Sequence, residues 1–199
     1  MNNILSFITL GLLSTSLYAS EINGSYVSYN GEKGLSYNLD IDVYSNFSLI
    51  GGYTKINADT KPSYLELGLI DNTELHIFED KHKFLNISYG LKYTHQFNKH
   101  FAASFSSQQL KTSFEDSKAI TENKGILHTV TLSYEQMPFK FSVSKNRVIN
   151  YSYLPEDYIA YNTFKFDYFF NDNFSVRTEY SDDSILMTES YGLGFAYRF

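Results

Sequence analysis

The chain has 199 residues and a formal net charge of −6, and this acidic balance argues against a nucleic-acid partner. The absence of cysteine excludes disulfides, thiolate metal sites, a cysteine nucleophile and a lipid anchor on an N-terminal cysteine. Aromatic residues make up 18% of the sequence, with 18 tyrosines, 17 phenylalanines and no tryptophan, a proportion that suits the interfacial girdles of membrane β-barrels.

An apolar stretch at the N-terminus, from Ile4 to Leu13, has the length of the hydrophobic segment of a secretory signal peptide. Small or polar residues follow it at Ser14, Ser16 and Ala19, so we predict cleavage after Ala19, with residues 1–19 as the signal peptide and residues 20–199 as one mature domain. The segment departs from the usual pattern because no lysine or arginine precedes it and because Leu17 stands three residues before the cut. No apolar run is long enough for a membrane-spanning helix.

Strict alternation of apolar and polar residues begins after the first expected strand and runs from 35 to 43. The apolar positions are Leu35, Tyr37, Leu39, Ile41 and Val43, and Ser36, Asn38, Asp40 and Asp42 lie between them. This pattern predicts a strand with two different faces. Such a strand separates core from water in a soluble sandwich and lipid from lumen in a membrane barrel, so the pattern alone leaves both architectures open.

Short turns between aromatic residues alternate along the chain with longer polar connections. The turns are 44–47, 97–101, 137–139 and 170–174, and the longer connections are 57–62, 114–124, 146–157 and 181–188. Asparagine and aspartate recur in the turns because they tolerate left-handed backbone and hydrogen-bond locally to it. Short turns at one end and long loops at the other are typical of bacterial outer-membrane barrels.

Dividing the chain at these connections predicts an all-β fold, a membrane-spanning antiparallel up-and-down β-barrel of about twelve strands. The expected strands are 21–29, 35–43, 47–57, 63–70, 73–79, 83–97, 101–113, 125–137, 139–149, 158–170, 174–183 and 188–199. Losing the short pair around 71–72 would leave ten strands, and eight would require merging segments across clear turns. An even number places both termini on the periplasmic side.

The last strand has five large apolar residues on one face and small or polar residues on the other. The apolar face consists of Tyr191, Leu193, Phe195, Tyr197 and Phe199. This strand resembles the C-terminal signal by which the bacterial barrel assembly machinery recognises its substrates, including the terminal phenylalanine. With the signal segment and the turn at 171–174, it makes the whole chain resemble the small Gram-negative outer-membrane β-barrels, such as OmpA-type barrels and small porins. The resemblance implies the fold and a location in the cell outer membrane, and leaves the activity open.

Extending the alternation to every expected strand predicts which charged side chains face the lumen. The acidic set is Asp40, Asp42, Glu66, Glu135, Asp167 and Glu179, and the basic set is Lys92, Lys140, Lys165, Arg177 and Arg198. Because enclosed charges are costly unless they are paired, the near balance predicts cross-lumen ion pairs rather than a selectivity filter of one sign. We therefore expect these residues to form a charge network that fills and stabilises the barrel interior.

Narrow, porin-like passage of small solutes or a structural role is the function that these features favour. The alternatives are an outer-membrane enzyme acting on lipid or surface peptide, and an adhesin or receptor that binds through its loops. Enzymatic activity is disfavoured because no residue set suggests a triad; His95 and His128 are expected on the membrane face and His100 in a periplasmic turn. No catalytic, cofactor or metal site is predicted. The expected partners are outer-membrane lipid, lipopolysaccharide and the barrel assembly machinery.

Overall fold

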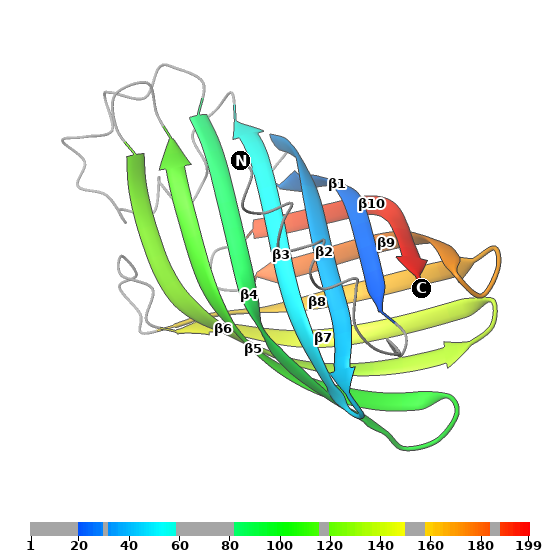
Figure 1. Cartoon of the computed structure of the whole chain (residues 1–199). Coiled ribbons are helices and arrows are strands. Elements are labelled where there is room, and N and C mark those ends of the chain that lie inside the picture. Colours follow the sequence, from blue (N-terminus) through cyan, green and yellow to red (C-terminus); the bar gives the residue numbers. More distant parts are fainter. Residues whose placement is uncertain (1–19, 30–31, 59–81, 116–119, 150–157, 184–187) are drawn as a thin grey trace.

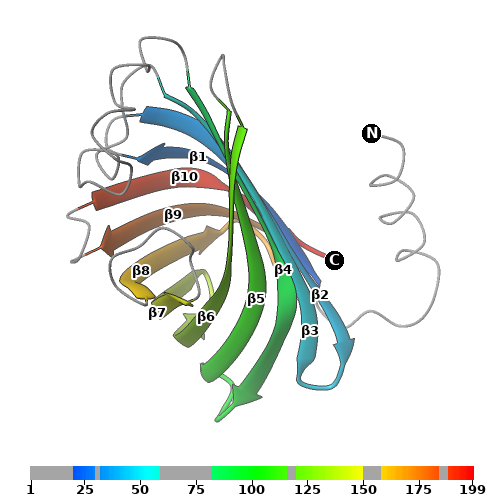
Figure 2. The same cartoon turned by 90° about the vertical axis from the view of Figure 1, so that its left-hand side faces the viewer.

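The computed structural model describes residues 20–29, 32–58, 82–115, 120–149, 158–183 and 188–199. Its ten strands form one closed antiparallel barrel in which each strand pairs with its neighbours in sequence and β1 pairs with β10 (Figure 1). Turned by 90°, the wall curves from β1 through β10 to β6 and back through β5 and β4 (Figure 2). The strands are β1 (Glu21–Tyr29), β2 (Glu32–Tyr44), β3 (Phe47–Ala58), β4 (His82–Gln96), β5 (Phe101–Glu115), β6 (Ile120–Gln136), β7 (Phe139–Ile149), β8 (Tyr158–Phe169), β9 (Phe174–Asp183) and β10 (Thr188–Arg198).

The two ends of the barrel differ. The turns 45–46, 97–100, 137–138 and 170–173 lie at one end, here called the turn end, and the opposite end is called the loop end. Asparagine side chains close two of the turns: Asn98 Oδ1 accepts hydrogen bonds from the amides of His100 and Phe101, and Asn171 Oδ1 accepts them from the amides of Asn173 and Phe174. The local hydrogen bonding expected of asparagine in turns is therefore present.

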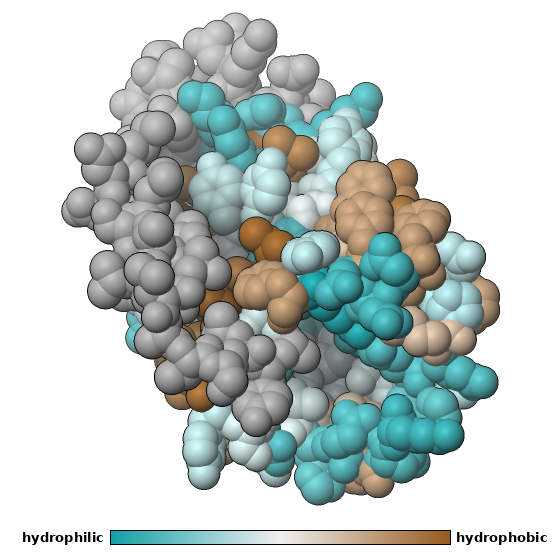
Figure 3. Space-filling model, turned by 45° about the vertical axis from the view of Figure 1, so that its right-hand side comes forward, coloured by the Kyte–Doolittle hydropathy of each residue, from teal (hydrophilic) through white to brown (hydrophobic). Residues whose placement is uncertain are grey.

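The side chains of the strands are apolar outside and polar inside, the reverse of a soluble barrel. Large hydrophobic side chains lie exposed on the outer face, and the exposed fraction is 48–61% for Ile22, Leu35, Leu49, Phe105, Leu132, Phe141, Leu193 and Phe195. The inner face holds buried polar residues, among them Asn23, Ser48, Ser106, Thr112, Ser144, Asn146, Thr163 and Ser175. Figure 3 shows apolar and polar side chains gathered in separate patches on the side that it presents. An apolar exterior around a polar interior is the arrangement of a transmembrane barrel.

The strand bounds expected from the alternation agree closely with the structure, but the expected number of strands is wrong. The expected strands 63–70 and 73–79 lie outside the described residues, and β3 pairs directly with β4 from Phe47 opposite Tyr93 to Ala58 opposite His82. Because this ladder is continuous, β3 and β4 are direct neighbours, and the described strands close the barrel with ten, which is the alternative that omits the short pair. The expected signal peptide, residues 1–19, and Glu66 also lie outside the described residues.

No helix among the described residues is long and apolar enough to cross a membrane.

The seam between the first and last strands closes the barrel. The amide of Phe199 donates a hydrogen bond to the carbonyl of Ser20 over 3.0 Å, and the amide of Ser20 donates one to the carbonyl of Phe199 over 3.2 Å. Gly194 lies on the inner face of this seam, where an added Cβ would lie 2.1 Å from the carbonyl oxygen of Gly24. Glycine at this position therefore allows β1 and β10 to approach closely enough to pair.

Candidate functional site

Small hydroxyl and amide side chains form much of the lumen wall and hydrogen-bond from strand to strand. On one side, Thr129 of β6 donates to Asn146 of β7 over 2.8 Å, Asn146 donates to Thr163 of β8 over 2.9 Å, and Thr163 lies 2.9 Å from the hydroxyl of Ser181 on β9. On the opposite side, Asn38 donates to Asn23 over 3.0 Å. These bonds satisfy the hydrogen-bonding groups of the side chains just named. This part of the lumen wall is therefore polar without carrying charge.

Charged residues concentrate at the turn end of the lumen. Six of them, from β1, β6, β7, β8, β9 and β10, are here called the turn-end charge cluster: Glu21, Glu135, Lys140, Asp167, Arg177 and Arg198.

Arg177 is the most enclosed cation of this cluster. Its Nε donates to Asp167 Oδ1 over 2.6 Å and one of its terminal nitrogens donates to Glu21 Oε1 over 2.7 Å. The Arg177 side chain is 7% exposed and that of Asp167 only 1% exposed. Since Arg177 is on β9 and Glu21 on β1, the guanidinium extends past β10, where its register partner is Gly194.

Among the ion pairs of the described residues, the pair made by Arg198 joins the strands that lie farthest apart in the barrel. The two terminal nitrogens of Arg198 donate to the two carboxylate oxygens of Glu135 over 2.8 and 2.9 Å, and its guanidinium lies 4.3 Å from the ring centre of Phe169. Arg198 is on β10, Phe169 on β8 and Glu135 on β6, so the side chain crosses the interior over three intervening strands. Two parallel hydrogen bonds and the aromatic face below fix the guanidinium in place. We call the Arg198–Glu135 pair the crossbar.

The remaining inward charges are also paired, or are bonded to a hydroxyl. Lys92 of β4 bonds to Asp40 of β2, Lys165 lies 3.2 Å from Glu179, and Lys140 lies 3.9 Å from Glu135. Asp42 accepts a hydrogen bond from Ser48. Every basic side chain described on the inner face therefore lies near an acidic one, and no track of one sign runs along the described part of the lumen.

The structure places every charged residue predicted to face the lumen on the inner face, apart from Glu66, which lies outside the described residues. These residues are Asp40, Asp42, Lys92, Glu135, Lys140, Lys165, Asp167, Arg177, Glu179 and Arg198. Sequence reasoning missed Glu21 and Phe169. Glu21 alternates with the outward Ile22, which is a signal that could have revealed it. Phe169 has no such signal because the adjacent Phe170 is equally apolar.

The described histidines do not assemble a catalytic set. His95 and His128 lie on the outer face, as expected, and His100 lies in a turn, where its Nδ1 is 2.8 Å from the carbonyl of Glu135. His128 faces Ser107 on β5 and Arg147 on β7 in register, and neither strand places a carboxylate opposite it. Among the described residues, no cluster of histidine and acidic side chains could hold a metal ion.

No family model matches the chain, and no curated protein matches its sequence. Solved structures do match. The NanC porin aligns over 92% of this chain and 100% of its own, with 11% sequence identity and a TM-score of 0.54. The fold is that of a transmembrane β-barrel. The KdgM porin gives a TM-score of 0.48 over 90% of this chain and 99% of its own, at 11% identity. The Ail protein of Yersinia pestis gives a TM-score of 0.42 over 91% of this chain and 99% of its own, at 13% sequence identity.

The likeness to the NanC porin supports the fold and nothing finer, because the two sequences are only 11% identical. The resemblance to small outer-membrane barrels, predicted from the last strand and the turns, is confirmed at this level. What the lumen does must be argued from its own residues.

Proposed function

We propose that this chain is an integral outer-membrane protein that provides a narrow, weakly ion-selective passage for small solutes. In this proposal the turn end lies at the periplasmic side and the turn-end charge cluster is the constriction. The observation that carries the proposal is the crossbar: Arg198 of β10 is held by two hydrogen bonds to Glu135 of β6 across the interior. A pair that spans the lumen divides the cross-section available to a solute.

The remainder of the lumen wall supports passage in preference to a filled core. Its inward side chains are largely small and polar, such as Ser36, Ser106, Ser144 and Thr163, and glycine occupies inward positions at Gly52 and Gly90. Short hydroxyl side chains project less far into the barrel than the large apolar side chains that fill a closed core. They also offer hydrogen bonds to water and to neutral polar solutes.

Local matching of charge argues for weak selectivity. Every basic side chain of the described inner face lies near an acidic one, so neither cations nor anions meet an uncompensated field along this wall. Channels selective for one sign use rings of one charge. A balanced lumen is instead expected to discriminate by size, with small neutral and zwitterionic molecules as the substrate class.

The test is single-channel conductance of the refolded mature protein in planar bilayers, comparing the wild type with the double variant E135Q/R198Q. Replacing both crossbar residues by neutral amides removes the pair that spans the lumen and leaves neither Arg198 nor Glu135 charged without the other. We expect small, weakly selective openings in the wild type and a clearly larger conductance in the double variant. The matched control is the double variant K111Q/E122Q, which removes an ion pair of 2.6 Å on the outer face and should leave conductance unchanged.

Insertion is verified for each protein by the difference in gel migration between boiled and unboiled samples. Silent membranes for both the wild type and E135Q/R198Q, with insertion confirmed, would refute a passage and leave a structural role. Equal conductance of the wild type and E135Q/R198Q would refute the crossbar as the constriction.

A further inference from the structure

Five aliphatic side chains lie on the inner face in the loop-end half of the barrel. They come from five strands and are here called the collar: Val27 of β1, Ile56 of β3, Leu110 of β5, Leu127 of β6 and Val148 of β7. Ile56, Leu110 and Val148 are only 7%, 8% and 4% exposed, and they are three of the five buried hydrophobic residues among those that the structure describes. Apolar burial inside the described barrel is therefore concentrated at this end.

Four residues of the collar lie at the same distance from the turn end. Each is nine residues from the turn-end residue of its strand, and the pairs are Ile56 and Phe47, Leu110 and Phe101, Leu127 and Gln136, and Val148 and Phe139. Nine residues span roughly 30 Å along a strand, or roughly 23 Å along the axis of a barrel whose strands tilt by about 40°. In the ladder between β6 and β7, Leu127 and Val148 are directly opposite each other. The collar is therefore one layer across the lumen.

Glycines lie beside the collar residues and allow the aliphatic side chains to lie along the wall. Gly34 of β2 is opposite Val27 on one side and Ile56 on the other. A Cβ added at Gly34 would lie 2.8 Å from Cγ1 of Ile56, so the side chain of Ile56 extends over this glycine. Leu110 is similarly opposite Gly125. Packing against the wall therefore contributes to the low exposure of Ile56.

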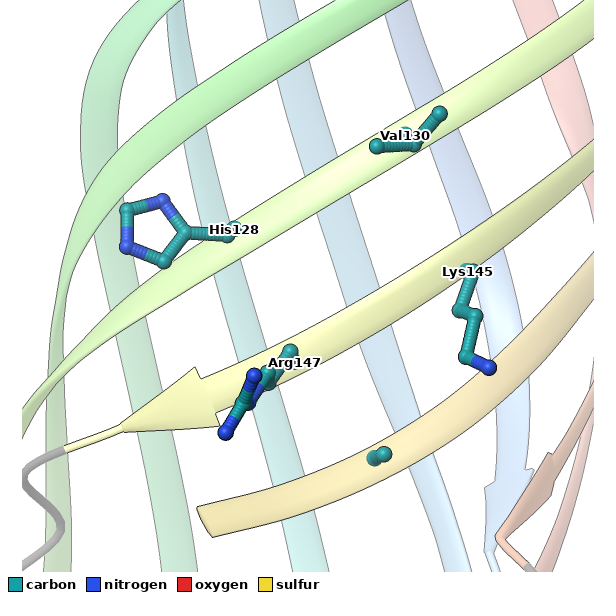
Figure 4. Close-up of a pocket in the computed structure, with 5 residues that line it drawn as sticks. His128, Val130, Lys145 and Arg147 are labelled. Carbon is teal, nitrogen blue, oxygen red and sulfur yellow. The ribbon is translucent and has the colours of Figure 1, made fainter.

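The polarity of the two faces is reversed at this level of β6 and β7. The outward residues next to Leu127 and Val148 are labelled on the two strands in Figure 4, and they are His128, Val130, Lys145 and Arg147. Nearer the turn end the usual order holds, because Thr131 and Ser144 face inward and their hydroxyls lie 2.8 Å apart. The collar therefore changes the chemistry of the lumen and not that of the lipid-facing surface.

An apolar layer opposes ions more strongly than it opposes uncharged molecules. An ion that crosses a narrow layer of aliphatic side chains gives up part of its hydration shell and gains no hydrogen bond in exchange, whereas an uncharged solute loses much less. On the turn-end side the next inward residues are Thr129 and Asn146, which are polar. The collar thus differs from the crossbar: the crossbar divides the cross-section, and the collar disfavours charge.

We propose that the collar is a hydrophobic barrier to ions and that it makes the passage selective for uncharged solutes. The inference rests on the proposed function, because a barrier in the lumen matters only if the lumen conducts. It narrows the substrate class to small neutral molecules, since a zwitterion carries two hydrated charges and is opposed for the same reason as an ion. The collar and the crossbar then act in series, one at each end of the polar wall.

The experiment compares two double variants that change the polarity of a residue pair and keep its size. L127N/V148T replaces two opposite collar residues by polar residues of similar volume, and the control L132N/V143T makes the same changes in the opposite pair Leu132 and Val143 on the outer face. Two readouts are taken on the refolded barrel: potassium chloride conductance in planar bilayers, and swelling of vesicles in erythritol, a neutral polyol. We expect L127N/V148T to raise the conductance at least about threefold and to leave the swelling rate nearly unchanged. The control should change neither.

Each outcome decides between the collar and the passage. Erythritol uptake by the wild type with equal conductance of the wild type and L127N/V148T would reject the collar alone. A parallel rise of conductance and swelling in L127N/V148T would show a wider passage and would also overturn the barrier. If neither probe crosses the wild type or L127N/V148T, the passage is rejected and the collar with it.

Insertion of every variant is verified by heat-dependent gel migration. The single variants V148T and V143T provide a milder pair if either double variant does not refold, because each exchanges one methyl group for a hydroxyl. V148T should raise the conductance by a smaller factor and V143T should not. Equal conductance of these two variants would overturn the proposal.

Discussion

Arg198, the last residue of β10, is hydrogen-bonded through both terminal nitrogens to Glu135, near the end of β6, at 2.8 and 2.9 Å. The two residues are 63 positions apart in the sequence and are brought together only when the barrel closes. Their pairing therefore couples the closing strand to the opposite part of the wall, in addition to the ladder hydrogen bonds that join β10 to its neighbours β9 and β1.

A double-mutant cycle on the crossbar is expected to show strong coupling. The single variants R198Q and E135Q each leave one charge of the crossbar without the other, whereas the double variant removes both, so the double variant should be less destabilised than the sum of the two. We expect a coupling free energy of about 1–3 kcal/mol. Reversible urea unfolding in lipid vesicles, followed by circular dichroism because the chain has no tryptophan, measures it. Additive single effects would show that the contact contributes nothing to stability.

Substitutions at two glycines of β10 should have very different effects. In G194A the new Cβ would lie 2.1 Å from the carbonyl oxygen of Gly24 and 2.6 Å from Cα of Ser25, both backbone atoms of β1 that cannot rotate away. In G192A the nearest atoms are Cβ of Glu179 at 3.4 Å and Cγ1 of Val27 at 3.6 Å, which are ordinary contacts. We expect G194A to reduce the fraction of refolded barrel severalfold and G192A to refold as the wild type does. Heat-dependent gel migration quantifies the fraction, and equal refolding would refute the role of Gly194.

The sequence was sufficient to predict the architecture because alternation encodes the two faces of a barrel strand locally. The alternation from Leu35 to Val43 indicates which residues of that strand point outward. The same alternation, applied to the other strands, places Lys92, Asp167 and Arg177 on the inner face. The number of strands was overestimated because short alternating stretches such as 63–70 look alike in sequence whether or not they join the ladder. Only the pairing of β3 with β4 distinguishes the two cases.

The contacts within the lumen could not be predicted from the sequence for a different reason. Alternation shows that Arg198 and Glu135 face inward, but which inward residues meet depends on the stagger of the closed barrel. The stagger follows from pairings such as Glu21 opposite Arg198, which bring residues from the two ends of the chain together. Glu21 and Phe169 were overlooked because each lies at the end of a strand, where few neighbours establish the phase.

Phe199 is predicted to contribute to outer-membrane assembly through its aromatic ring. Its backbone is predicted to contribute to closing the barrel between β1 and β10. Phe199 is 40% exposed, and its ring is stacked against Tyr197 at 6.2 Å, whereas its amide and carbonyl pair with Ser20. F199A keeps the two backbone hydrogen bonds, so it should refold in detergent like the wild type but accumulate less in the outer membrane of expressing cells. Deletion of Phe199 should impair both. Membrane fractionation and refolding assays separate the two effects, and wild-type insertion of F199A would remove the ring from the assembly signal.

The pair Lys165–Glu179 allows the charge balance of the lumen to be tested with a predicted sign. The two side chains lie 3.2 Å apart on adjacent strands, each 31% exposed, on the loop-end side of the crossbar. E179Q leaves the ammonium of Lys165 uncompensated and should shift the reversal potential in a salt gradient toward anion selectivity. K165Q leaves the carboxylate of Glu179 and should shift it toward cations by a similar amount. K111Q, which removes a charge from the outer face, should leave the reversal potential unchanged. Shifts of the same sign in both lumen variants, or none in either with conductance intact, would show that the permeation path does not pass this pair.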